Sequence, residues 1–423
     1  MSTFQAPRGT RDILPTTQGV WNHITTVANQ VAVQMGFLPI RTPIYEDLAL
    51  FQRSIGEGTD VIDKELFLVR GKHTEVETYA LRPEGTAGIV RAYIEHGMHT
   101  WSQPVKLYSV LNCFRYERPQ KGRYREHWQF DLEFFGEHGA FSDAWIIYTT
   151  WLFLQRLGLK GITLKLNSLG TLSERTAFIN ALRDYLTPLQ DKLSEDSKRR
   201  LTTNPLRILD SKDSADRTLL EHAPLLADFF STESSARFES VKEYLEAWQI
   251  PYFLDAHLVR GLDYYSHTTF EWVCMGPEGE SPALGGGGRY DGLLPQLGGQ
   301  DSGAVGAGIG LDRIVEELEA QNLTEALALR VPRIYIAAAD PIGRIAARQL
   351  IATLAAEGIA LEADLEKESL GSQIKRAGKI GARFVVIQGQ LEVELGTVQV
   401  KDLKDGSQQS LKIEELVRFL RNA

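Results

Sequence analysis

Three polar side chains alternate along one strand-like segment of this 423-residue chain. Gln129, Asp131 and Glu133 are separated by aromatic and aliphatic residues within residues 129–135. Successive side chains of a strand point to opposite faces, so these three share a face. Two carboxyl groups and an amide are costly in a hydrophobic core, because buried polar groups need partners. The segment therefore predicts a strand that borders a polar pocket.

The neighbouring sequence predicts an α+β fold built on one antiparallel sheet flanked by helices. Residues 105–110 and 268–273 are rich in aromatic and β-branched residues, as strands are. Residues 18–35 carry apolar side chains at helical spacing, and Gly36 follows as a helix end. Prolines make residues 37–46 extended.

The residue pattern of the chain indicates a sheet domain, a helical insertion and a separate C-terminal domain. The sheet domain begins with residues 1–169 and resumes over residues 249–325, while the charged, helix-favouring residues 170–248 predict a helical insertion. Residues 331–423 open with alternating strand and helix patterns up to residue 389. That order predicts a small α/β domain with a mostly parallel sheet.

Composition excludes several classes of protein. The chain has 43% hydrophobic and 24% charged residues and lacks both a membrane-spanning run and a secretory signal. Its two cysteines, Cys113 and Cys274, form no cluster, so we expect no zinc site and reduced, buried thiols in the cytoplasm. The net charge of −9 argues against a protein that coats nucleic acid non-specifically, although one particular RNA remains a possible partner.

Two polar segments precede or follow a predicted strand. In residues 81–88, LRPEGTAG, either Glu84 binds a substrate ammonium beside Thr86, or Thr86 caps a helix while Glu84 faces its dipole. In residues 114–125, five of twelve side chains are Arg or Lys. Such a hairpin is either a solvated basic loop or a phosphate-binding element, since guanidinium groups offer paired donors to phosphate.

Two further segments are unusual for a plain sheet domain. Arg260 stands between apolar residues, so it either awaits an anion or pairs with Asp263. Residues 285–292 and 304–313 are rich in glycine, which lets a ligand approach the backbone. The second of them resembles GxGxG, but its late position in an antiparallel context rejects a dinucleotide-binding oxidoreductase. The chain also has no GxxxxGK[ST] phosphate loop.

Together these segments resemble the histidyl-tRNA synthetases, a family of class II aminoacyl-tRNA synthetases. Residues 7–12 are similar to the family's opening, 36–46 to its motif 1 at the dimer interface, 114–133 to motif 2 and 305–313 to motif 3. Residues 258–265 and 283–292 resemble segments peculiar to the histidine enzymes, and 373–389 resembles part of their anticodon-binding domain. The resemblance covers essentially the whole chain.

The resemblance implies a histidine pocket. By this likeness Glu84, Thr86 and Gln129 hold the α-amino group of histidine. Glu133 hydrogen-bonds the imidazole together with the tyrosine pair Tyr264 and Tyr265. An imidazole ring has two polar nitrogens to satisfy, which suits such a set of side chains.

The resemblance also implies an ATP site and a tRNA site. Arg115 and Arg260 correspond to arginines on the α-phosphate, and Arg313 to one near the γ-phosphate. His127 stands where the family usually has the phenylalanine that stacks on adenine, and Asp131 stands where a small residue is common. The tRNA acceptor end would meet two residues of the motif 2 loop, Gln120 and Arg125.

The implied reaction uses ATP with Mg²⁺ and neither zinc nor a redox cofactor. Histidine attacks the α-phosphate without a general base, and tRNA(His) then accepts the histidyl group. Arg260→Ala is predicted to lower the activation rate far more than histidine affinity. The alternative is the synthetase-like regulatory subunit of ATP phosphoribosyltransferase, which generally lacks the anticodon domain. The resemblance also implies a homodimer.

Overall fold

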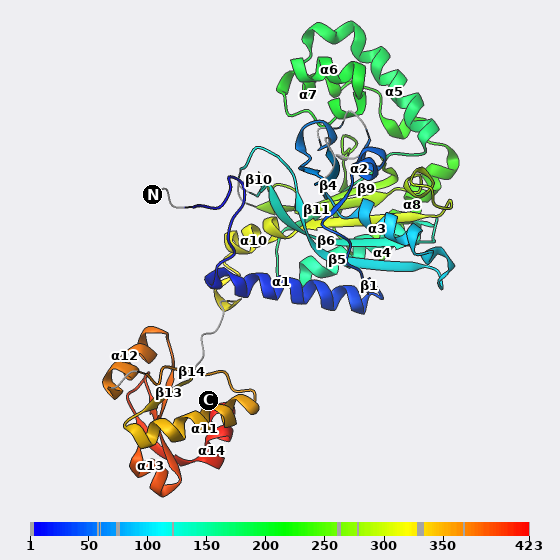
Figure 1. Ribbon diagram of the computed structural model, residues 1–423. Coiled ribbons are helices and arrows are strands. Elements are labelled where there is room, and N and C mark those ends of the chain that lie inside the picture. The colour runs from blue at the N-terminus through cyan, green and yellow to red at the C-terminus, as the bar shows by residue number, and fades with distance from the viewer. Residues whose placement is uncertain are drawn as a thin grey trace. The chain divides into compact units, whose positions relative to one another are not determined.

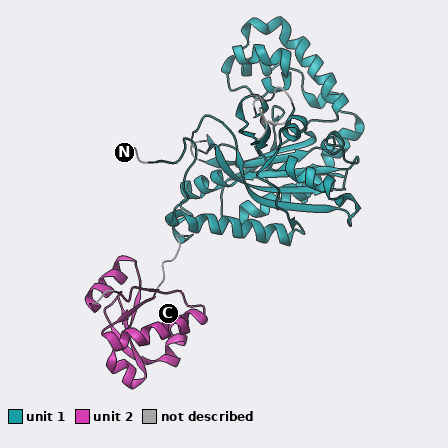
Figure 2. Ribbon diagram, viewed as in Figure 1, with its two compact units in different colours: residues 1–328 teal, residues 329–423 magenta. Residues whose placement is uncertain are grey.

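The computed structural model describes residues 4–56, 59, 61–72, 77–120, 122–259, 264–276, 279–327, 334–366 and 369–422. The chain divides into two compact units, Met1–Ala328 and Leu329–Ala423 (Figure 2). No helix in these ranges is long and apolar enough to cross a membrane.

A mainly antiparallel sheet forms the centre of the first unit (Figure 1). Its strands, in spatial order, are β1 Leu38–Pro39, β5 Val105–Phe114, β6 Glu126–Phe135, β12 Ala304–Gly310, β11 Gly285–Arg289, β9 Ser266–Gly276, β7 Ile162–Ser168 and β8 Tyr252–Leu254, with β10 Gly279–Glu280 paired to β9. Only the two edge strands in this described set, β1 and β8, run parallel to their neighbours. The prediction of an antiparallel sheet is confirmed.

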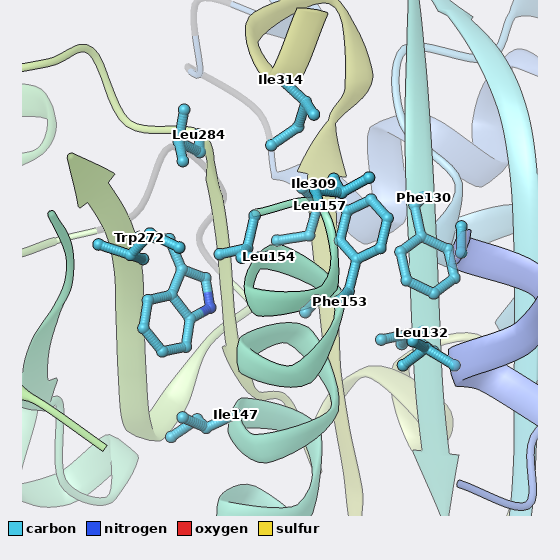
Figure 3. Close-up of a cluster of buried hydrophobic side chains, with 14 of the residues drawn as sticks. Phe130, Leu132, Ile147, Phe153, Leu154, Leu157, Trp272, Leu284, Ile309 and Ile314 are labelled. Atoms are coloured by element: carbon cyan, nitrogen blue, oxygen red, sulfur yellow. The ribbon is translucent and has the colours of Figure 1, made fainter. Parts of the chain in front are cut away.

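One face of this sheet is covered by α1 Pro15–Gln34, α4 Ala140–Arg156 and α10 Leu311–Ala320. Phe130 and Leu132 of β6 and Ile309 of β12 enter this core and pack with Phe153 of α4 (Figure 3). Burying such apolar surface supplies most of the driving force for folding. Because side chains alternate, the intervening residues of β6 and β12 face the opposite side.

The opposite side of the sheet carries α3 Thr86–Glu95 and a second core. Leu107 of β5 and Phe135 of β6 pack there with Tyr93 of α3 and with Phe178 and Leu182 of α5, which spans Leu172–Leu186. The remaining elements of the unit are α2 Leu48–Ile55, α5 Leu172–Leu186, α6 Glu195–Thr203, α7 Ser214–Leu220, α8 Thr232–Ala247, α9 Leu293–Gln296 and a small sheet of β2 Tyr45–Asp47, β4 Glu77–Leu81 and β3 Leu68–Arg70. Helices α5 to α8 fall within the predicted insertion, whose exact boundaries stay a prediction.

The second unit holds a five-stranded sheet among its described residues. Its elements are β13 Ile334–Ala338, α11 Pro341–Ala356, β14 Glu362–Ala363, α12 Leu370–Lys379, β15 Phe384–Gln388, α13 Gln390–Leu395, β16 Thr397–Asp402, β17 Gln408–Lys412 and α14 Ile413–Asn422. Strands β14, β13 and β15 are parallel, as the alternating pattern predicts. The expectation of a mostly parallel sheet is wrong for the other half, because β16 and β17 add an antiparallel hairpin. That hairpin escapes sequence reasoning because β17 is polar and largely exposed.

Candidate active site

The site is built on a strip of the sheet that has glycine where other strands have side chains. Gly306, Gly308 and Gly310 of β12 pair with Glu133, Asp131 and Gln129 of β6. A Cβ atom on Gly306 would lie 1.8 Å from Oε2 of Glu133. The glycines of β12 therefore make room for polar side chains that extend across the sheet from β6. The predicted shared face of those three residues is confirmed.

Glu133 is the centre of a buried hydrogen-bond cluster. Its side chain is fully buried, and the Thr86 hydroxyl donates to Oε1 at 2.6 Å. The Tyr290 hydroxyl donates to Oε2. Burial raises the pKa of Glu133 well above its ordinary value, the two hydroxyl donors oppose that rise, and Asp131 and Glu84 add to it. A carboxyl group held from both sides in this way has a fixed orientation.

Glu84 occupies the turn that opens α3. Its Oε2 accepts from the Thr86 amide at 2.8 Å and its Oε1 from the Ala87 amide at 2.9 Å. Burial raises the pKa of Glu84, and these two amides oppose the rise. The helix-capping interpretation of this segment is thus correct for Glu84 but wrong for Thr86, whose hydroxyl donates to Glu133 instead of capping. Glu84 keeps lone pairs for a further donor.

Three tyrosines belong to the cluster around Glu133. Tyr264 and Tyr265 are buried, with ring centroids 4.6 Å apart, and Tyr264 lies edge-on to Tyr290 at 5.6 Å. Burial raises the pKa of Tyr264 well above its ordinary value, with further contributions from Tyr265, Glu84 and Glu133. Five of the six predicted histidine-binding residues, all except Gln129, therefore belong to one cluster. Arg260, with Asp263, lies outside the described residues.

Gln129, on the same strand as Glu133, lines a cleft of about 180 Å³. Arg115 and Arg313, predicted for the phosphates, both line the same cleft. Nε of Arg115 donates to the Pro83 carbonyl at 2.8 Å, and Nε of Arg313 donates to the Gly122 carbonyl at 3.3 Å. Nη1 of Arg313 also donates to the Ala283 carbonyl. A guanidinium group has five N–H donors, so each arginine keeps donors for an anion.

His127 lines the same cleft as the two arginines. Burial, together with the charges of Arg115 and Arg313, lowers its pKa to about 3. The ring is therefore neutral at physiological pH. Its Nδ1 atom is buried without a hydrogen-bond partner among the described residues. A neutral flat ring beside two guanidinium groups suits a flat, polar base.

The loop between β5 and β6 forms the rim of the cleft. Glu316 of α10 accepts from the Gly122 amide at 2.8 Å and from the Tyr124 hydroxyl at 3.3 Å. Gln120 is exposed on this loop. Arg125 lies 3.6 Å from the Tyr116 ring centroid and donates to the Arg8 and Glu117 carbonyls. Arg125 is thus engaged within the protein, whereas Gln120 is open to a partner.

Sequence reasoning assigned no role to two residues that organise the site. Tyr290 reaches Glu133 from a segment 157 positions away in the chain. Arg11 forms a 2.6 Å ion pair with Asp312, whose other oxygen accepts from the Trp128 amide at 2.7 Å. The segments that resemble the family include both regions, and the glycine run at residues 285–288 just before Tyr290 was the available signal.

A separate buried ion pair supports β11. Arg289 is fully buried, 2.7 Å from Asp143 of α4 and 2.8 Å from Asp291. Its guanidinium group also donates to the Ser142 hydroxyl at 2.6 Å. Arg289 is adjacent in sequence to Tyr290, so this network anchors the strand end that delivers the tyrosine.

Both cysteines are free and buried, as predicted. Cys113 donates its S–H to Oε1 of Gln129 at 3.1 Å, and burial raises its pKa well above the ordinary value. Within the described ranges, no group of three His, Cys, Asp or Glu side chains is arranged to hold a metal ion.

Known proteins match this chain throughout its length. Residues 9–314 match the family model of histidyl-tRNA synthetase, and residues 341–423 match that of an anticodon binding domain. Histidine–tRNA ligases of Synechococcus sp. (strain JA-3-3Ab) and Thermosynechococcus vestitus are 43% and 44% identical, over 99% and 98% of this chain and 99% and 95% of their own. The structure of apo S. aureus histidyl-tRNA synthetase superimposes with a TM-score of 0.82 at 32% identity, covering 99% of this chain and 100% of that one. The chain therefore belongs to the histidyl-tRNA synthetase family of aminoacyl-tRNA synthetases.

Proposed function

We propose that this protein activates L-histidine with ATP and transfers it to the 3′ end of tRNA(His). One observation carries the proposal. The buried polar cluster around Glu133, which we take as the histidine pocket, and an arginine-lined cleft share strand β6: Glu133 belongs to the cluster, and Gln129 lines the cleft. An amino acid in the pocket would direct its carboxylate toward phosphates in the cleft, which is the arrangement that adenylate formation needs.

The pocket suits histidine because it offers polar partners to a ring with two nitrogens. Glu133 receives one hydroxyl donor on each oxygen and retains lone pairs for an imidazole N–H. Tyr264 and Tyr265 provide aromatic walls and hydroxyl groups for the remaining nitrogen. An apolar amino acid would leave these buried groups unpaired, so discrimination against it should be strong.

The cleft suits ATP. Arg115 is assigned to the α-phosphate and Arg313 to the γ-phosphate, with His127 against adenine and Arg260 on the α-phosphate by family likeness. Guanidinium donors stabilise the charge that develops when the histidine carboxylate attacks the α-phosphorus in line and pyrophosphate leaves. Mg²⁺ would enter with ATP and neutralise phosphate charge, and the carboxylates of Glu117 and Glu271 in the cleft lining are of the kind it prefers.

The second step brings the tRNA to the same site. The ribose 3′-hydroxyl attacks the carbonyl carbon of the adenylate, and AMP leaves. Gln120 and Arg125 on the rim are assigned to the acceptor end, and residues 341–423 to the anticodon. A homodimer in the cytoplasm is the assembly and location that the family likeness favours.

The regulatory-subunit alternative is disfavoured. That protein generally lacks an anticodon-binding domain and loses parts of the substrate motifs. Here residues 341–423 match such a domain, and Glu84, Gln129, Glu133 and Arg115 stand together around the pocket and cleft.

Glu133→Gln tests the assignment of the pocket. An amide cannot accept from both the Thr86 and the Tyr290 hydroxyl without turning one N–H toward a donor. We expect histidine KM to rise at least about 10-fold while ATP KM changes little. Glu126→Gln, the same change on the same strand but on its other face, is the matched control. A loss confined to ATP would overturn the assignment.

A further inference from the structure

Asp131 is a buried carboxyl group with no evident structural purpose. It lies on β6 between Gln129 and Glu133, on the face that borders the site, and is 2% exposed. Both of its oxygens are buried without a hydrogen-bond donor among the residues that the structure describes. A carboxyl group in this condition normally loses much more solvation than it regains, so it calls for a ligand.

Two glycines leave the space that this carboxyl group occupies. A Cβ atom on Gly85 would lie 2.0 Å from its Oδ2, and one on Gly308 would lie 2.9 Å from its Oδ1. Gly85 precedes α3, beside Glu84, and Gly308 lines the cleft. The same Cβ atom on Gly308 would lie 3.7 Å from Nε2 of Gln129. The carboxyl group therefore lies where Glu84 and Gln129 also converge.

The neighbouring cations do not hydrogen-bond Asp131. Arg82 donates to the Asn112 carbonyl at 2.7 Å and to its side chain at 2.9 Å, and Arg115 donates to the Pro83 carbonyl. Neither arginine donates to an oxygen of Asp131. Their charges act on Asp131 only through space.

An α-ammonium group has three N–H donors and needs three acceptors. Glu84 provides one, since each of its oxygens accepts only one backbone amide. Gln129 provides a second through the lone pair of Oε1 that Cys113 leaves free. The Thr86 hydroxyl proton is directed to Glu133. The geometry points to Asp131 as the third acceptor: we propose that its carboxylate binds the α-ammonium group of histidine and so sets part of the enzyme's affinity for its amino acid.

This inference rests on the proposed placement of histidine between Glu84 and Glu133. It has a consequence for protons. Burial and the charge of Glu84, opposed by Arg82 and Arg115, raise the pKa of Asp131 to about 8. Glu133 and Cys113 also face this group, and both have a raised pKa. Without histidine, Asp131 would therefore be largely protonated at neutral pH, and an arriving ammonium ion would favour its carboxylate.

Calorimetric titration with two ligands tests the proposal. Histidine and 3-(imidazol-4-yl)propionate share the ring and the carboxylate, but only histidine has the ammonium group. Asp131→Asn should weaken histidine binding by about 10- to 100-fold, because a charge-assisted hydrogen bond is lost. It should leave the affinity for the propionate unchanged or increased. Glu126→Gln, on the opposite face of β6, should change neither affinity.

The unmodified protein provides a second measurement. The ratio of histidine affinity to propionate affinity should rise between pH 6.5 and 8.5 as Asp131 ionises, and this rise should vanish in Asp131→Asn. Equal losses for both ligands in the variant, or wild-type histidine affinity in it, would overturn the role of Asp131 alone. If the unmodified protein binds no histidine, the proposed function itself fails.

Discussion

The hydroxyl of Tyr290, at the end of β11, donates to Oε2 of Glu133 on β6, two strands away. The Thr86 hydroxyl holds the other oxygen of the same carboxyl group. The side chain assigned to imidazole recognition is therefore oriented by residues from two distant segments. Positioning by such neighbours is what keeps a binding site within a productive geometry.

Tyr290→Phe should weaken histidine binding while leaving the fold intact. The change removes one donor to a buried carboxyl group, which corresponds to about a 10-fold or greater rise in histidine KM. Tyr252→Phe is the matched control, because Tyr252 donates to Glu246 at 2.9 Å on an exposed surface. Steady-state kinetics of histidine activation compares the two. Similar histidine KM values for both variants would contradict the positioning role.

Gly306→Ala should remove histidine binding by a steric route. The added methyl carbon would meet Oε2 of Glu133 at 1.8 Å, so the carboxyl group must move. We expect the overpacking to cost about 1–3 kcal/mol of unfolding free energy and the displaced carboxyl group to weaken histidine binding. Gly292→Ala is the control, since a Cβ there has nothing within 4 Å. Direct binding measurements should show wild-type histidine affinity for Gly292→Ala. A loss of histidine affinity in Gly292→Ala would contradict the steric explanation.

Arg289→Ala should lower the stability of the fold more than it changes the catalysed reaction. Removing a fully buried cation leaves Asp143, among the described residues, with only its longer, 3.2 Å ion pair to Arg237, so we expect a cost of up to about 3–5 kcal/mol of unfolding free energy. Arg199→Ala removes an exposed ion pair with Asp196 and should cost about 0–1 kcal/mol. Urea titrations measure both. A loss under 1 kcal/mol for Arg289→Ala would show that the buried network is not needed.

His127 should make the protein less stable in acid. Its folded-state pKa of about 3 lies below the ordinary value of 6.5, so the fold favours the neutral ring. This stability is fully present above pH 6.5 and is lost as the pH falls toward 3, by up to about 1.4 kcal/mol for each pH unit. His127→Phe should therefore become more stable relative to the wild type as the pH falls from 6.5 toward 3. It should also retain ATP KM at pH 7, whereas His127→Ala should raise it.

Thermal unfolding of the wild type and His127→Phe at pH 5 and pH 7 checks the first half of this expectation. A constant difference between the two proteins at both pH values would show that the imidazole titrates normally in the fold.

Much of the fold follows from local patterns in the sequence. The alternation around Asp131 placed three polar residues on one face of β6, and the alternating strand and helix patterns predicted β13 to β15. Both signals are short-range, because each depends on residues a few positions apart. The exposed strand β17 carries no such signal, since its side chains need not be apolar.

The details of the site depend on contacts between distant segments. No local pattern shows that Tyr290 hydrogen-bonds Glu133 or that Gly306 must lack a Cβ atom. Nor does one show that the Thr86 hydroxyl donates to Glu133 and does not cap its own helix. The family likeness identified most of the pocket, but it gave Asp131 only as a departure from a small residue. Its lack of a partner among the described residues became visible only in three dimensions.

Histidine-dependent exchange of pyrophosphate into ATP tests the central claim most directly. The reaction requires amino-acid activation but not tRNA, so it probes the pocket around Glu133 and the cleft around Arg115 together. The account predicts rapid exchange with histidine and only background exchange with each of the other amino acids, with the histidine signal lost in Arg115→Ala. Exchange with histidine no higher than with other amino acids would contradict the account.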